Sequence, residues 1–271
     1  MSDAFPAVVR TWLAAQCKRW SPQYQLDVAF FVRQWCREWP EAAPTIEEVE
    51  RYVAGRRRSG SRLNTERACF VAMCRWAATR RLLISDPSAI WEPVRRNPKK
   101  EPTSFSPEEE RALLSVAPEP IARLIRFALL TGLRAGTLRA LTWAMVEDRE
   151  DGPALVLPAA VMKARRDEVL PLAAAARAVL GSRDAGRVFP RVHSYELSRT
   201  FSRLVKEAGL RPELTFHSLR KTFATRLLDR NVPVHTVMHL GCWRSAEVLL
   251  RYYAARSALS SSRALLADAL A

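Results

Sequence analysis

Six polar residues in the second half of the chain have the types and the order needed to hold a phosphodiester and attack it. Two arginines can grip non-bridging phosphate oxygens with planar, permanently charged forks. A tyrosine hydroxyl can act as the nucleophile, while lysine and histidine can move protons. This chemistry requires no metal, nucleotide or other cofactor. The six residues are Arg134, Lys163, His217, Arg220, Trp243 and Tyr252.

The local sequence around the two arginines favours a site. His217 and Arg220 are three residues apart, so on a helix they lie on one face, near an N-terminus whose amide groups favour an anion. Two polar residues on a solvated helix face are the alternative interpretation of this pair. Arg134 follows a tight turn at residues 131–133 that ends an apolar helix, so its cation should project from a rigid element.

The other two residues with a clear local setting are Lys163 and Trp243. Lys163 lies just before a predicted hairpin turn at residues 164–167, from which a long side chain can reach a leaving group. Trp243 precedes Tyr252 by nine residues, and its indole N–H can donate to a phosphate oxygen while the ring closes the site.

Helical periodicity dominates the elements that must position these residues. In the first 94 residues it predicts helices over 8–20, 26–39, 46–53 and 64–79, the third opened by a Thr45–Glu48 capping box. Residues 95–104 are rich in proline and cations and predict an extended linker. Ser106, Pro107 and Glu109 then restart helical structure. Core packing is the expected role of the tryptophans in the first domain, namely Trp12, Trp20, Trp35, Trp39 and Trp76.

Residues 105–271 are predicted to form a second domain. Helices are expected up to residue 130, from the turn at 131–132 to about residue 146, and over 194–208, 217–229, 234–240 and 246–253. Only residues 154–172 show convincing β-structure. The sequence therefore predicts a mainly α chain with two domains and one small antiparallel sheet.

Composition favours a polyanionic partner. The net charge is +15 and the pI is near 10.5, with basic residues in excess in both domains. A charged surface kept for solubility is the alternative. No run of ~18 apolar residues or signal-peptide pattern occurs, so we expect no membrane and a cytoplasmic protein. The five cysteines form no C-x-x-C pair, and His235 with His239 lacks a third ligand, so we expect reduced thiols and no metal site.

Three basic clusters are candidates for contacts with the DNA backbone, because such contacts need only unpaired cations on a reachable surface. The first follows the third helix, where a solvated loop is the alternative. The second is the linker, which could let the two domains close around a duplex, and the third is the hairpin turn. They comprise Arg56, Arg57, Arg58 and Arg62; Arg95, Arg96, Lys99 and Lys100; and Arg165 and Arg166.

These motifs resemble the tyrosine recombinases, also called phage integrases. The resemblance implies a helical, SAM-like core-binding domain over residues 1–94, the linker at 95–104, and an α-rich catalytic domain of the DNA-breaking-rejoining fold over 105–271. It rests on Thr131-Gly132-Leu133-Arg134, Lys163, Phe189-Pro190, His217-Ser218-Leu219-Arg220, Leu240-Gly241 with Trp243, and Tyr252, in the family's order and spacing.

What the resemblance implies is site-specific recombination of double-stranded DNA. Tyr252 would form a 3′-phosphotyrosyl bond and Lys163 would protonate the leaving 5′-oxygen to free a 5′-hydroxyl, while the two arginines, His217 and Trp243 stabilise the charge. Spacing from Trp243 favours Tyr252 over the neighbouring Tyr253. The implied working form is a homotetramer on paired sites at the nucleoid, with accessory proteins as possible partners. Integration, excision and resolution all stay open.

Two further functions and three departures from the family pattern accompany this interpretation. Thr137 stands where the family commonly has an acid, Lys221 where it usually has histidine, and Trp243 where most members have histidine and a minority have tryptophan. A type IB topoisomerase uses a similar set of residues, and a non-catalytic DNA-binding regulator could use the same scaffold, to which Thr137 points. The apolar segment from residue 257 is expected to dock either on its own domain or, as in the family, on a neighbouring subunit.

Overall fold

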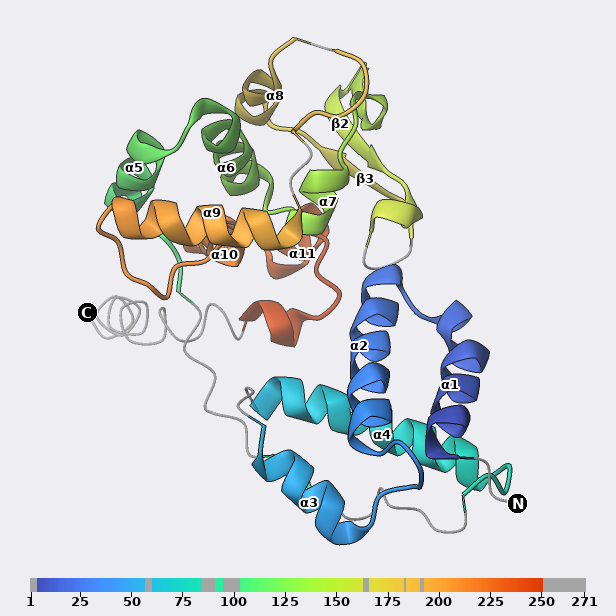
Figure 1. The fold of residues 1–271 in the computed structure, drawn as a ribbon. Coiled ribbons are helices and arrows are strands. Elements are labelled where there is room, and N and C mark those ends of the chain that lie inside the picture. Colours follow the sequence, from blue (N-terminus) through green and yellow to red (C-terminus); the bar gives the residue numbers. More distant parts are fainter. Residues whose placement is uncertain are drawn as a thin grey trace, which may run out of the picture. The chain divides into compact units, whose positions relative to one another are not determined.

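The computed structural model divides the chain into two compact units, Met1–Lys99 and Lys100–Ala271. The structure describes residues 4–56, 60–83, 91–94, 103–162, 166–182, 184–190 and 193–250. Figure 1 shows that helices make up most of each unit, with strands in the second. The predicted fold class, mainly α with a small antiparallel sheet, is confirmed.

The first unit contains α1 (Phe5–Gln16), α2 (Pro22–Glu38), α3 (Ile46–Ala54) and α4 (Gly60–Ala78). The predicted capping box of Thr45 and Glu48 opens α3. Helix α4 begins at Gly60, before the predicted start at residue 64, so Arg62 lies in its first turn and not in a loop. Arg62 is held there by an ion pair with Asp27 at 2.9 Å and by the ring of Phe31, 4.7 Å from its guanidinium carbon.

Aromatic side chains form the core of the first unit. Trp12, Trp35 and Trp39 are buried, while Trp20 and Trp76 pack against the same cluster, so their predicted role as core residues is confirmed. A fully buried carboxylate, Glu66 of α4, accepts hydrogen bonds from the Trp35 indole of α2 and the Tyr52 hydroxyl of α3. These bonds join three helices and offset the cost of burying the polar atoms.

The second unit begins with α5 (Pro107–Val116) and α6 (Glu119–Thr131). The predicted capping box of Ser106 and Glu109 opens α5. Helix α6 ends at the predicted turn: Thr131 is its last residue, and Gly132, whose backbone is left-handed (φ 62°), completes the helix cap. Chain direction therefore changes immediately before Arg134.

The predicted helix from this turn to about residue 146 is wrong. Helix α7 covers only Ala135–Ala140 and is followed by a 3₁₀ turn (Trp143–Met145) and by strand β1 (Val146–Arg149). Strand β1 pairs antiparallel with β2 (Gly152–Leu157), which pairs antiparallel with β3 (Glu168–Pro171). Only Val146 of β1 is buried, so this strand carries no alternating apolar pattern that the sequence could have shown.

The remaining described elements are α8 (Ala174–Leu180), α9 (Ser194–Glu207), α10 (Phe216–Asp229), α11 (Val234–Leu240) and a helical stretch over 246–250. Helix α10 packs against α6 and α11 and meets α9 through Phe216 and Phe201, whose rings are 5.5 Å apart. Phe216 and Leu219 of α10 belong to the large core of the unit. Phe223 belongs to a separate small cluster with Val237, Trp243 and Leu249. Within the described ranges, no helix is long and apolar enough to cross a membrane.

Candidate active site

Two arginines and a tryptophan converge beside α10, near the turn after α6 and the end of α11. Arg134 precedes α7, and its Nη1 donates to the carbonyl of Cys242 at 3.3 Å. Arg220 is buried on α10 and donates through Nη1 to the carbonyl of Gly132. Its guanidinium carbon lies 3.6 Å from the centroid of the Trp243 ring. Three of the six predicted site residues are therefore brought together by the fold.

Gly132 determines how the first arginine approaches α10. Its φ of 62° is one that side chains with a Cβ rarely adopt, and an added Cβ would lie 2.3 Å from the Phe223 ring. Phe223 stands three residues after Arg220 on α10. The turn thus lies directly against the helix that carries the second arginine, and its carbonyl reaches that arginine.

The end of α11 is built to fold Trp243 back over the helix. The amide of Trp243 donates to the carbonyl of Met238 at 2.8 Å, and that of Cys242 donates to His239 at 3.0 Å, the pattern of a Schellman cap. Cys242 takes the left-handed position, with φ 53°. A Cβ on Gly241 would overlap the Trp243 ring at 1.6 Å, so glycine is required there. The cap leaves the Cys242 carbonyl directed to Arg134.

The surroundings of the Cys242 thiol give the electrostatic character of the site. Burial raises the pKa of this thiol, Glu168 raises that pKa further, and Arg220, Arg134 and Arg166 act in the opposite direction. Three guanidinium groups and one carboxylate therefore act on one buried point. Glu168 opens β3 and forms an ion pair with Arg166. Because positive charge exceeds negative charge here, the region suits an anionic ligand.

His217 lies in the first turn of α10, three residues before Arg220. Its side chain is exposed, whereas Arg220 is 3% exposed, so the helix presents one group to solvent and holds the other in the interior. Lys221 is half-buried, and burial lowers the pKa of its ammonium group. His235 and His239, whose spacing is one that zinc ligands can have, are both exposed on α11.

Several predicted residues lie outside the described part of the chain. On the catalytic side, the structure describes the residues up to Met162, which immediately precedes Lys163, and up to Leu250, two positions before Tyr252. The C-terminal segment from residue 257 is not described either. The predicted residues that lie outside the described ranges are Lys163, Tyr252, Tyr253, Arg57, Arg58, Arg95, Arg96, Lys99, Lys100 and Arg165.

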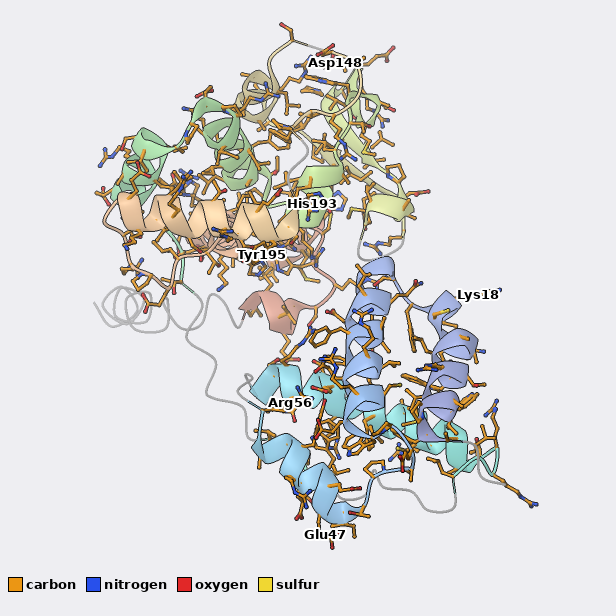
Figure 2. All side chains as sticks on the ribbon, in the orientation of Figure 1. Lys18, Glu47, Arg56, Asp148, His193 and Tyr195 are labelled. Carbon is orange, nitrogen blue, oxygen red and sulfur yellow. The ribbon has the colours of Figure 1, made fainter. Side chains whose placement is uncertain are left out.

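The described members of the predicted DNA-contact set are Arg56, Arg62 and Arg166. Arg56 lies just past the end of α3 (Figure 2), half-buried, with its guanidinium carbon 4.0 Å from the centroid of the Tyr52 ring. Arg62 is engaged by its ion pair with Asp27, and Arg166 is exposed and pairs with Glu168. Protein contacts therefore already orient these three side chains.

Sequence reasoning missed a basic face on α9. Arg199, Arg203 and Lys206 are exposed at helical spacing, and within the described ranges no carboxylate forms an ion pair with them. Tyr195, 71% exposed on the same helix (Figure 2), lies beneath Arg199, with 5.7 Å between the guanidinium carbon and the ring centroid. The spacing of these cations within the predicted helix was the signal that could have identified the face.

Comparisons with known proteins agree with this geometry. The model of the phage integrase family matches residues 104–258. The integrase of Salmonella phage P22 is 25% identical over 166 residues, which cover 55% of this chain and 42% of that integrase. The chain thus spans less than half of that relative's length. The tyrosine recombinase XerD of Ralstonia nicotianae is 26% identical over 245 residues, which cover 80% of this chain and 77% of XerD.

Solved structures share the fold over nearly the whole chain. A lambda integrase dimer bound to a COC′ core site has a TM-score of 0.75 at 18% identity, covering 92% of this chain and 95% of that one. A lambda integrase tetramer bound to a Holliday junction has a TM-score of 0.74 at 17% identity, covering 92% and 77%. Since the family model spans more than half of its residues, the chain belongs to the phage integrase family of tyrosine recombinases.

Proposed function

We propose that the chain is a site-specific DNA recombinase that cuts and rejoins strands through a 3′-phosphotyrosyl intermediate. The observation that carries the proposal is the convergence of Arg134, Arg220 and Trp243 from three separate elements. Planar guanidinium groups held on rigid elements are well suited to bind the non-bridging oxygens of one phosphate. Family membership supports this use of the site.

The fixed orientation of the arginines would lower the barrier by electrostatic stabilisation. Each arginine commits one N–H group to a backbone carbonyl, and the Trp243 ring packs against the face of Arg220. These contacts set the direction of the remaining N–H groups before any substrate arrives. Preorganised donors need no rearrangement when charge develops on the phosphate, which is why such donors contribute strongly to rate. His217 and the indole N–H of Trp243 would add donors to the same phosphate.

The covalent steps would belong to Tyr252 and Lys163. The tyrosine hydroxyl would give its proton to His217 as its oxygen bonds to phosphorus, the bond from phosphorus to the 5′-oxygen would break, and Lys163 would give that oxygen a proton. Reversal by the 5′-hydroxyl of another strand would complete an exchange. One phosphoester replaces another throughout, so the reaction would require no external energy source.

DNA would be held on basic surfaces of both units. The net charge of +15 and the exposed cations of α9 support this part of the proposal. The lambda integrase dimer on a core site and the tetramer on a Holliday junction support duplex DNA as partner and a tetramer on paired sites. Such an enzyme would work at the nucleoid in the cytoplasm, with accessory proteins able to set its direction.

Covalent trapping of DNA tests the proposal. Selection of bound duplexes from a random library would provide a binding site, and a nicked substrate carrying two inverted copies would trap any covalent adduct on a denaturing gel. Wild-type protein and Tyr253→Phe should form the adduct, and Tyr252→Phe should bind the same DNA without forming it. Absence of an adduct with the wild type would favour the regulator. Adducts and plasmid relaxation without any exchange between two sites would favour the topoisomerase.

A further inference from the structure

Thr137 is a buried polar residue at the centre of α7, three residues after Arg134. Its hydroxyl donates to the carbonyl of Val161 at 3.3 Å and lies 3.9 Å from the sulfur of Met162. Helix α7 is therefore bonded to the end of the 3₁₀ turn Ala159–Val161 that follows β2.

The anchored residues immediately precede Lys163 in the sequence. Met162 is buried in the large core, so its backbone cannot shift without moving other core side chains. On the returning side of the same connection, a carboxylate oxygen of Asp167 accepts from the amide of Ala159 at 2.7 Å. Contacts on both sides thus fix the base of the connection that contains Lys163.

We infer that Thr137 is a positioning residue for Lys163, an inference that rests on the proposed function. Arg134 begins the short helix to which Thr137 belongs, so α7 links the phosphate-binding arginine to the connection that contains the proposed acid. A displacement of about 1 Å between reacting groups can cost roughly 100-fold in rate. Loss of the link between α7 and Val161 should therefore slow proton transfer to the leaving oxygen.

The chemistry of this hydrogen bond also explains why a hydroxyl side chain suits this position. The partner of the side chain is a carbonyl oxygen, which only accepts hydrogen bonds. An ionised carboxylate also only accepts, so it could not form this bond. A hydroxyl can donate. Thr137 is accordingly the residue type that this backbone arrangement requires, and it is compatible with an active enzyme.

The test compares two substrates that differ only in the leaving atom. On a normal phosphodiester, Thr137→Val should cleave about 10- to 100-fold more slowly than wild type. On a substrate with sulfur in place of the scissile 5′-oxygen, whose departure needs little protonation, the variant should approach the wild-type rate. Thr137→Ser keeps the donor and should remain close to wild type on both. Thr142→Val, a half-buried threonine outside the site, is the matched control.

A double variant shows whether the effect passes through the lysine. In a Lys163→Ala background, Thr137→Val should cause no additional loss on the normal substrate. Equal slowing of Thr137→Val on both substrates, an unchanged rate on the normal substrate, or a further loss in that background would overturn the inference. If Thr137→Val does not fold, as judged by thermal unfolding and DNA binding, Thr137→Ala provides the same comparison. A wild-type protein that forms no adduct would instead overturn the proposed function.

Discussion

Replacing Gly132 by alanine should damage both the stability of the second unit and its proposed chemistry. The left-handed backbone of Gly132 costs an alanine about 1 kcal/mol. The new Cβ would lie 2.3 Å from the Phe223 ring, and forcing such an overlap in a packed core costs about 1–3 kcal/mol. The substitution incurs both costs, so their sum should lower the free energy of unfolding by about 2–4 kcal/mol. Cleavage should fall more than DNA binding, since the Gly132 carbonyl holds Arg220.

Urea unfolding with adduct formation on the same samples measures both effects. Gly136→Ala is the matched control, because an added Cβ there meets nothing within 4 Å and the residue lies inside α7, where alanine should stabilise by about 0.5–1 kcal/mol. Phe223→Leu should recover part of the loss in Gly132→Ala by relieving the overlap, but not the backbone cost. A Gly132→Ala protein that unfolds within about 0.5 kcal/mol of wild type and cleaves normally would contradict both estimated costs.

The remaining predictions concern α9, the candidate active site and the core of the first unit. Arg199→Ala and Arg203→Ala should each weaken DNA binding and reduce the slope of log affinity against log salt concentration by about one. An unchanged slope would show that α9 does not contact the DNA. Arg220→Lys should lose cleavage by at least about 100-fold without losing DNA binding, because a point charge cannot replace a planar fork, and near-normal adduct formation would contradict this. Glu66→Leu should lower the free energy of unfolding of the first unit by about 2–5 kcal/mol, because it leaves the Trp35 indole N–H and the Tyr52 hydroxyl without their acceptor. Glu66→Gln keeps an acceptor oxygen and should cost less. Equal free energies of unfolding for the two variants, measured in urea, would refute the role of Glu66 as acceptor. Because burial raises the pKa of its thiol, Cys242 should resist iodoacetamide at pH 8 in the folded protein and react in urea, which peptide mass analysis can follow. Rapid labelling of Cys242 in the folded protein would contradict the burial of its thiol.

Helices with strong caps could be predicted from sequence because their signals are local. The boxes at Thr45 and Ser106 and the glycine stop at Gly132 each depend on a few adjacent residues. Strand β1 could not be predicted, since only one of its residues faces the core and its pairing partner, β2, follows later in the chain. The ion pair of Arg62 with Asp27 could not be predicted, because the two residues lie on different helices and are 35 positions apart in sequence.

The site shows the same division between local and distant information. Arg134 and Arg220 could be proposed as site residues because their motifs reflect turns and helix faces within a few residues. Their hydrogen bonds to the carbonyls of Cys242 and Gly132 join segments far apart in sequence, and no spacing rule predicts them. The role inferred for Thr137 likewise depends on a backbone carbonyl at Val161, which has no side-chain signature.

The small cluster behind Arg220 has a consequence for the order in which the site assembles. Residues 234–250 pack on the rest of the second unit through Cys242, which belongs to the large core, and through a small cluster in which Val237, Trp243 and Leu249 meet Phe223 of α10. Such a small apolar group forms a cooperative unit that can open at a lower free energy than the large core. A ligand held jointly by Arg220 and Trp243 would stabilise the closed form by mass action. Hydrogen-exchange protection of α11 would then increase when DNA is bound.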